Sequence, residues 1–167
     1  MPKLIRWRGG VAAWADDPFT AVDDDQPVPP GDVIVSLTRF QREGRGMIAE
    51  GRSVGVRLAP DEAPEALVLD LPKLALVALA FPKFRDGRAY SSARILRERL
   101  GFVRELRAVG DVLLEMAPSL IRCGFDAFAP ADASGPDDWT GAGRRFRHVY
   151  QRAADGRVPA FAERQGV

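Results

Sequence analysis

Three cations gather in a short polar loop that directly follows the apolar run ending at Phe81. Two serines follow this loop, at the start of a predicted helix. Guanidinium groups donate paired hydrogen bonds to sulfate, phosphate or carboxylate, and the free N–H groups of a helix start favour the same anions. The candidate anion-binding residues are Lys83, Arg85, Arg88, Ser91 and Ser92. The alternative is an exposed basic loop in which Asp86 pairs with one arginine and a serine only caps the helix.

A second set of candidates belongs to the next predicted strand, 105–109. Arg107 lies within that strand, and Asp111 follows it after Gly110. As a carboxylate at a strand end, Asp111 could act as a general acid or base or orient an arginine. It could equally be the N-cap of the following helix, a role that contributes about 1 kcal/mol. The two roles are compatible, so Asp111 and Arg107 are the candidate catalytic residues.

The predicted helix 91–100 carries arginines on the face opposite its apolar residues. Arg94 and Glu98 are four residues apart, which allows a salt bridge along the helix. This face is typical of a solvated helix surface. The alternative is a partner-docking surface that uses Arg94 and Arg97.

Composition narrows the classes of function. The formal net charge is +1, which gives no sign of nucleic-acid binding, although residues 83–122 alone hold nine basic and five acidic groups. One cysteine and one histidine are too few for the usual structural zinc sites, and no metal site is expected. The sequence has no glycine-rich nucleotide motif and no cysteine set for an iron–sulfur cluster, so the cofactor stays unknown. The apolar runs are far too short to span a membrane, and a cytoplasmic location is expected.

Short β-branched or apolar runs alternate with helical patterns in the middle of the chain. The predicted strands are 33–37, 54–58, 74–81 and 105–109, with 126–129 as a fifth. Such alternation predicts an α/β fold with a mostly parallel sheet of four or five strands built from βα units. The sheet could be open or resemble part of a barrel, because eight units are needed to close one.

The two ends of the chain look less regular than the middle. Prolines and the run Asp23-Asp24-Asp25 in residues 1–30 are typical of a loosely structured lead-in and linker. Within this lead-in, residues 4–8 could form a short strand, with Gly9-Gly10 as a turn to residues 11–14. Residues 31–130 form the predicted α/β core domain. Residues 131–167 are predicted to be a loop followed by a terminal helix.

The central segment also resembles a known protein family. The run from Phe81 through Phe102, then Glu105-Leu-Arg-Ala-Val-Gly-Asp-Val-Leu and Arg122-Cys-Gly-Phe-Asp-Ala-Phe, is similar to a bacterial family of unknown function. Its members are often labelled oxidoreductases of sulfite reduction, because they accompany assimilatory sulfite reductase. The similarity covers residues 30–128 and is most specific in the central fifty residues of the chain. The family has no established catalytic residues, so the resemblance assigns none here.

The resemblance implies an accessory or oxidoreductase role in sulfite reduction and sulfur assimilation. The expected ligand is a small oxyanion or a phosphate-bearing cofactor, bound at the carboxyl ends of the third and fourth predicted strands. The alternative is a non-catalytic partner of sulfite reductase. Whether the chain forms a homodimer is left undecided by the sequence. Where such proteins carry an acid–glutamine pair after 110–113, this chain has Glu115-Met-Ala-Pro118, which puts that part of the site in doubt.

Overall fold

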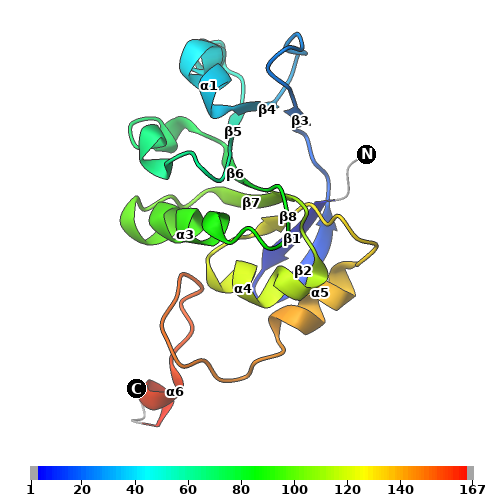
Figure 1. The fold of residues 1–167 in the computed structure, drawn as a ribbon, viewed down its shortest axis with the longest axis vertical. Coiled ribbons are helices and arrows are strands. Elements are labelled where there is room, and N and C mark those ends of the chain that lie inside the picture. The colour runs from blue at the N-terminus through cyan, green and yellow to red at the C-terminus, as the bar shows by residue number, and fades with distance from the viewer. Residues whose placement is uncertain (1–3, 165–167) are drawn as a thin grey trace.

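One curled sheet of eight strands forms the body of the protein (Figure 1). The computed structural model describes residues 4–164. The strands follow the order β2-β1-β8-β7-β6-β5-β4-β3 across the sheet. They are β1 (Leu4–Arg8), β2 (Val11–Ala15), β3 (Thr20–Ala21), β4 (Val33–Ser36), β5 (Val54–Leu58), β6 (Leu76–Phe81), β7 (Glu105–Gly110) and β8 (Ala127–Phe128). From β3 to β8 all neighbours are parallel, whereas β1 runs antiparallel to both β2 and β8.

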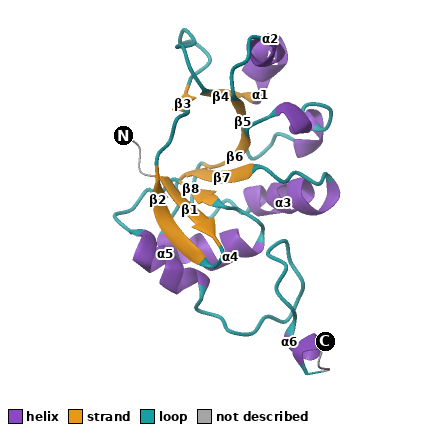
Figure 2. Ribbon diagram, turned by 180° about the vertical axis from the view of Figure 1, so that it is seen from behind, coloured by secondary structure: helices purple, strands orange, loops and turns teal. Residues whose placement is uncertain are grey.

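The helices that connect β4 to β8 lie on one face of the sheet because these strands follow one another in chain order. Each crossover is expected to be right-handed, so each returns on the same side. Figure 2 shows these helices on one side of the curved sheet, with the C-terminal helix apart from it. The α-helices are α1 (Leu37–Arg39), α2 (Arg45–Ala49), α3 (Arg88–Arg94), α4 (Ala117–Arg122), α5 (Pro136–Gly143) and α6 (Ala160–Glu163). π-Helical turns at Phe40–Gly44 and Ile95–Arg99 and 3₁₀ turns at Pro64–Leu67, Leu71–Lys73 and Leu114–Met116 complete the crossovers.

The main hydrophobic core fills the space between this helical layer and the sheet. Every second residue of the central strands points into it, and residues such as Val56, Val77 and Leu106 are fully buried. At the β8 end, the ring of Trp139 from α5 stacks on Phe128 with 4.4 Å between ring centroids. This packing fixes α5 against the sheet.

The opposite face of the sheet carries no helix, and it combines a row of arginines with a small apolar cluster. The strand register places Arg6, Arg107 and Arg57 in one row across it, with small residues between them. The segment that links β2 to β4 covers part of this face, where Phe19 packs against a small apolar cluster. The members of that cluster are Ile34, Leu76 and Ala78, with Val109 beside them.

The predicted α/β class and the mostly parallel sheet are confirmed, but the number of strands is eight rather than four or five. The difference arises chiefly at the N-terminus. Within the predicted lead-in, the short strand at 4–8 and the turn at Gly9-Gly10 are confirmed by the β1–β2 hairpin, whereas β3 and the joining of β1 to β8 were not predicted. Next to β8, the N–H of Trp7 donates to the carbonyl oxygen of Asp126 at 2.9 Å. The sheet curls but stays open, since its two edges are β2 and β3. Two helices, α5 and α6, lie in the predicted C-terminal segment 131–167.

Candidate functional site

The carboxyl ends of β6 and β7 are joined at one edge of the sheet. Phe81 and Gly110 are register partners, and the N–H of Asp111 donates to the carbonyl oxygen of Phe81 at 2.7 Å. Gly110 has a φ of 97°, and a Cβ there would lie 2.4 Å from that same carbonyl oxygen. Only glycine fits this position, because it combines a left-handed backbone with a close approach to the neighbouring strand. The loops after the two strands are therefore held side by side.

The Asp111 side chain orders the candidate anion-binding loop. Its Oδ2 accepts a hydrogen bond from the backbone N–H of Phe84 at 2.8 Å. The predicted N-cap role is wrong, because the 3₁₀ turn that starts at Leu114 receives its carboxylate from Asp132, whose Oδ2 accepts from the N–H of Leu114 at 2.9 Å. Asp111 is thus a positioning residue for the loop that follows β6.

The three predicted cations of this loop differ in how free they are. Arg88 donates to both carboxylate oxygens of Asp86, at 2.9 and 2.7 Å, and this guanidinium lowers the pKa of the Asp86 carboxyl. Lys83 and Arg85 are exposed, and neither side chain makes a hydrogen bond or ion pair with any residue in 4–164. The Arg85 guanidinium lies 5.3 Å from the centre of the Phe84 ring. The loop therefore presents two uncommitted positive charges beside one that is already neutralised.

The two predicted serines lie inside the helix rather than at its cap. Helix α3 begins at Arg88 with Gly87 as N-cap, and no side chain caps it. Ser92 Oγ donates to the carbonyl oxygen of Arg88 at 3.5 Å, whereas Ser91 is exposed. The helix starts earlier than predicted because the turn at 83–86 leads directly into it. In this turn the N–H of Asp86 donates to the carbonyl oxygen of Lys83.

Arg107 lies outside this loop, within β7, and the structure does not bring its side chain together with Asp111 at the strand end. It pairs in register with Ala78 in the middle of the sheet, and its side chain points to the helix-free face. There it is 3 % exposed and donates to both carboxylate oxygens of Asp17, at 2.7 and 3.0 Å. Glu105 accepts from Arg107 at 2.8 Å and also pairs with Arg6 at 3.0 Å. The four residues form a chain of alternating charges that ties the β2–β4 segment to the sheet.

The arginines proposed for docking have separate roles. Arg94 pairs with Glu98, at 3.1 and 3.0 Å, so the predicted salt bridge along the helix is confirmed. Arg97 is mostly buried and donates to three backbone carbonyl oxygens and to Asp126. Those carbonyls belong to Gly124, Phe102 and Arg104. Arg97 therefore joins helix to sheet and is not available to a partner.

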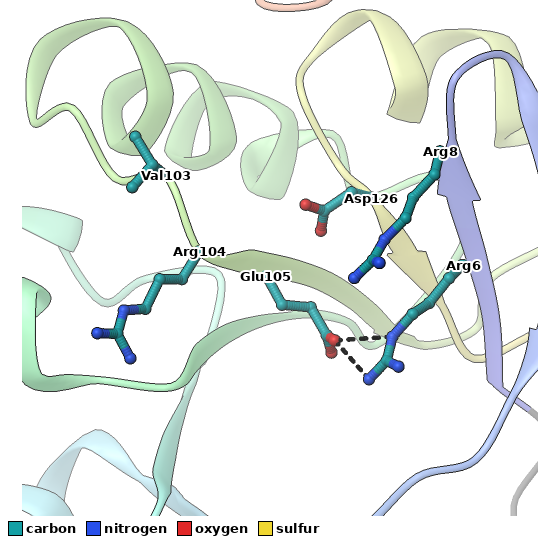
Figure 3. Close-up of a pocket in the computed structure, with 6 residues that line it drawn as sticks. All are labelled: Arg6, Arg8, Val103, Arg104, Glu105 and Asp126. Atoms are coloured by element: carbon teal, nitrogen blue, oxygen red, sulfur yellow. Dashed lines mark hydrogen bonds and ion pairs between the residues drawn. The ribbon is translucent and has the colours of Figure 1, made fainter.

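Sequence reasoning missed a hollow at the other end of the strands, where β7 and β8 begin. Its volume is about 320 Å³. It is lined by Arg6, Arg8, Val103, Arg104, Glu105 and Asp126 (Figure 3). The available signal was the alternation Arg6-Trp7-Arg8, which puts both arginines on one face of a strand. What could not be read was the pairing of β1 with β8, which brings that face next to Glu105.

Two further properties concern the described chain. None of its helices is long and apolar enough to cross a membrane. Across residues 4–164, no three histidine, cysteine, aspartate or glutamate residues are grouped so as to hold a metal ion.

Comparison with known proteins gives one match. The model of a family described as bacterial protein of unknown function (DUF934) matches residues 55–161. No curated protein and no solved structure matches the chain. The matched region contains the loop after β6, the end of β7 and most of the C-terminal segment.

Proposed function

We propose, from the premise that the chain belongs to the DUF934 family of bacterial proteins of unknown function, that it is an accessory protein of sulfite reduction that binds a small oxyanion. Both the sulfite connection and the oxidoreductase role come from the resemblance described above, since the matched family is described only as of unknown function. The proposed binding place is the loop after β6, next to the end of β7. Because no nucleotide or iron–sulfur motif stands in the sequence, electrons for any reduction would come from a partner protein.

One observation carries the oxyanion proposal: Asp111 fixes a loop that displays two unpaired cations. Its bond to the N–H of Phe84 holds the loop between Lys83 and Arg85. A preorganised loop binds an ion at a smaller entropic cost than a mobile one. Lysine supplies a compact charge and arginine a two-pronged donor, which together suit a pyramidal or tetrahedral oxyanion. Arg88 would contribute less, since Asp86 already occupies its guanidinium.

Replacing Lys83 and Arg85 together with alanine should weaken sulfite or sulfate binding by at least about tenfold, because charge-assisted hydrogen bonds are worth roughly 1.5–3 kcal/mol each. Both side chains are exposed, so the fold should be unaffected. Isothermal titration calorimetry with each anion, at constant ionic strength, measures the effect.

The matched control is Arg99→Ala, which removes an exposed cation from the far end of the same helical segment. Its dissociation constant should equal that of the unchanged protein. Equal affinities for the double variant and the unchanged protein would exclude this loop as the oxyanion site.

A second candidate function is non-catalytic docking to sulfite reductase, and the C-terminal segment 144–164 favours it. In Figures 1 and 2 this segment runs from α5 out to α6, clear of the sheet. Phe146, Tyr150 and Phe161 are 58, 87 and 60 % exposed. The segment also holds six arginines against two acidic residues. Exposed aromatic side chains with arginines are typical of protein interfaces.

Replacing Tyr150 and Phe161 with serine should abolish co-purification with sulfite reductase if the segment docks there, because aromatic anchors dominate binding energy. Arg94→Glu is the parallel test of the originally predicted helix surface. If co-purification is lost with Arg94→Glu but not with the aromatic changes, docking takes place through the helix surface that carries Arg94. Co-purification that survives both changes would contradict docking through either surface.

A further inference from the structure

The β1–β7 hollow is formed by the end of the first strand and the start of the seventh. Arg6 and Arg8 alternate along β1, and Val103 and Arg104 precede β7 (Figure 3). Its exposed lining is mostly polar, with Val103 as the apolar part of the rim. Because β1 is antiparallel to β8, its basic end meets the amino-terminal ends of β7 and β8. This edge is opposite to the one that carries Lys83 and Arg85.

The two acidic residues of the hollow are already compensated by cations from outside or beside it. Glu105 lies between Arg6 and Arg107, and the latter is balanced in turn by Asp17. These four residues sum to zero charge.

Asp126 is compensated in the same way from the helical side. Its Oδ1 accepts from the N–H of Leu106 at 2.8 Å and its Oδ2 from Arg97 at 3.1 Å. Burial raises the pKa of this carboxyl, and these two donors partly offset that effect. Neither acidic residue is therefore left to neutralise another arginine.

Arg8 and Arg104 remain without a counter-charge. Both side chains are exposed, and neither has a hydrogen-bond or ion-pair partner within the described residues. In Figure 3 they stand on opposite sides of Glu105, and Arg8 extends over the hollow. The hollow therefore carries an excess of two positive charges on side chains that can turn toward a ligand.

We propose that this hollow binds a ligand through a doubly charged tetrahedral oxyanion group, of the phosphate or sulfate class, held between Arg8 and Arg104. The guanidinium fork matches two oxygen atoms of such a group, and two guanidinium groups balance its charge. Arg6 stays on Glu105 and forms the floor of the site. A metal cation is disfavoured by the positive excess, and a wholly apolar ligand by the polar lining. The proposal is independent of the function proposed above, since no residue is shared between the two sites.

Titration of the isotopically labelled protein with inorganic phosphate, followed by two-dimensional ¹H–¹⁵N NMR, tests the proposal. Amide signals of 7–9 and 103–105 should shift and saturate. Alanine at both Arg8 and Arg104 should raise the dissociation constant from these signals by at least about tenfold, because two charge-assisted contacts are lost. Sulfate should act as phosphate does, and signals of 83–88 report separately on the other edge.

Two controls make the result decisive. Alanine at Arg145 and Arg152 removes two cations from the C-terminal segment and should leave the dissociation constant unchanged. Chloride at equal ionic strength should give no saturable shift. Saturation by chloride, absence of saturation by phosphate and sulfate, or an unchanged constant in the Arg8 and Arg104 variant would each overturn the proposal.

Discussion

Replacing Arg107 with alanine is expected to lower the free energy of unfolding by about 3–5 kcal/mol, the usual effect of removing one partner from a buried ion pair. The Arg107 side chain is 3 % exposed, and that of Asp17 is 8 % exposed. Without the guanidinium, the buried Asp17 carboxylate loses both hydrogen bonds from Arg107, and Glu105 is left with Arg6 alone. The loss should also release the segment that links β2 to β4 from the helix-free face.

Urea denaturation followed by circular dichroism measures this loss. Arg57→Ala is the matched control, because Arg57 lies in the same row of the sheet but is 40 % exposed, and its nearest carboxylate oxygen, from Asp23, is 3.7 Å away. Its removal should change stability by no more than about 1 kcal/mol, as for exposed ion pairs. Similar values for the two variants would show that the buried chain of charges does not hold the sheet face together.

Trp139→Ala should cost about 3–5 kcal/mol, as truncation of large buried aromatic residues does. Trp139 is fully buried, its ring stacks on Phe128, and its Nε1–H donates to Ser134 Oγ at 2.9 Å. The cavity left behind would open the contact between α5 and β8. Since this contact closes the end of the core, partial relaxation cannot refill it.

The midpoint of thermal unfolding gives the effect of Trp139→Ala directly. Phe161→Ala serves as control, because that ring is 60 % exposed on α6 and its loss should leave the midpoint almost unchanged. A midpoint for Trp139→Ala within 1 °C of the unchanged protein, where roughly 10 °C or more is expected, would rule out a supporting role for this contact.

The central strands were predictable because local pattern decides them. The run 54–58 is a strand with those bounds, and 33–37 and 105–109 differ from β4 and β7 by one residue each. Their alternating or β-branched residues must be buried on the helical face, and this requirement is visible in a short window of sequence. Local chemistry also decides the position of Pro118: α4 begins at Ala117 with the proline in its first turn, where a missing backbone N–H costs no helical hydrogen bond.

The place of the N-terminal hairpin in the sheet was not predictable, because long-range pairing decides it. The turn at Gly9-Gly10 suggests a hairpin, yet nothing local says that β1 pairs with β8, more than a hundred residues away. The predicted acidic linker also makes a contact with a residue distant in sequence, since Asp24 accepts from Ser36 Oγ at 2.6 Å. Such contacts appear only when the chain has folded.

The candidate site shows the same division. Local sequence places Lys83 and Arg85 correctly in a loop at a strand end, since a strand followed by a polar turn leaves little choice. It could not say which cations are free, because Arg88 is neutralised by a neighbour and Arg107 by a distant segment. Sequence also misassigned Asp111, whose partner, the N–H of Phe84, belongs to another loop.

A crystal structure with a heavy oxyanion tests most directly whether the loop after β6 binds such an ion. Crystals grown without sulfate and soaked in selenate would reveal the ion by its anomalous scattering. We expect an anomalous peak within hydrogen-bond distance of Lys83 and Arg85, with the hydrogen bond from the Phe84 N–H to Asp111 still in place. Occupied selenate elsewhere, with no peak at that loop, would contradict the claim that the β6 and β7 ends form the oxyanion site.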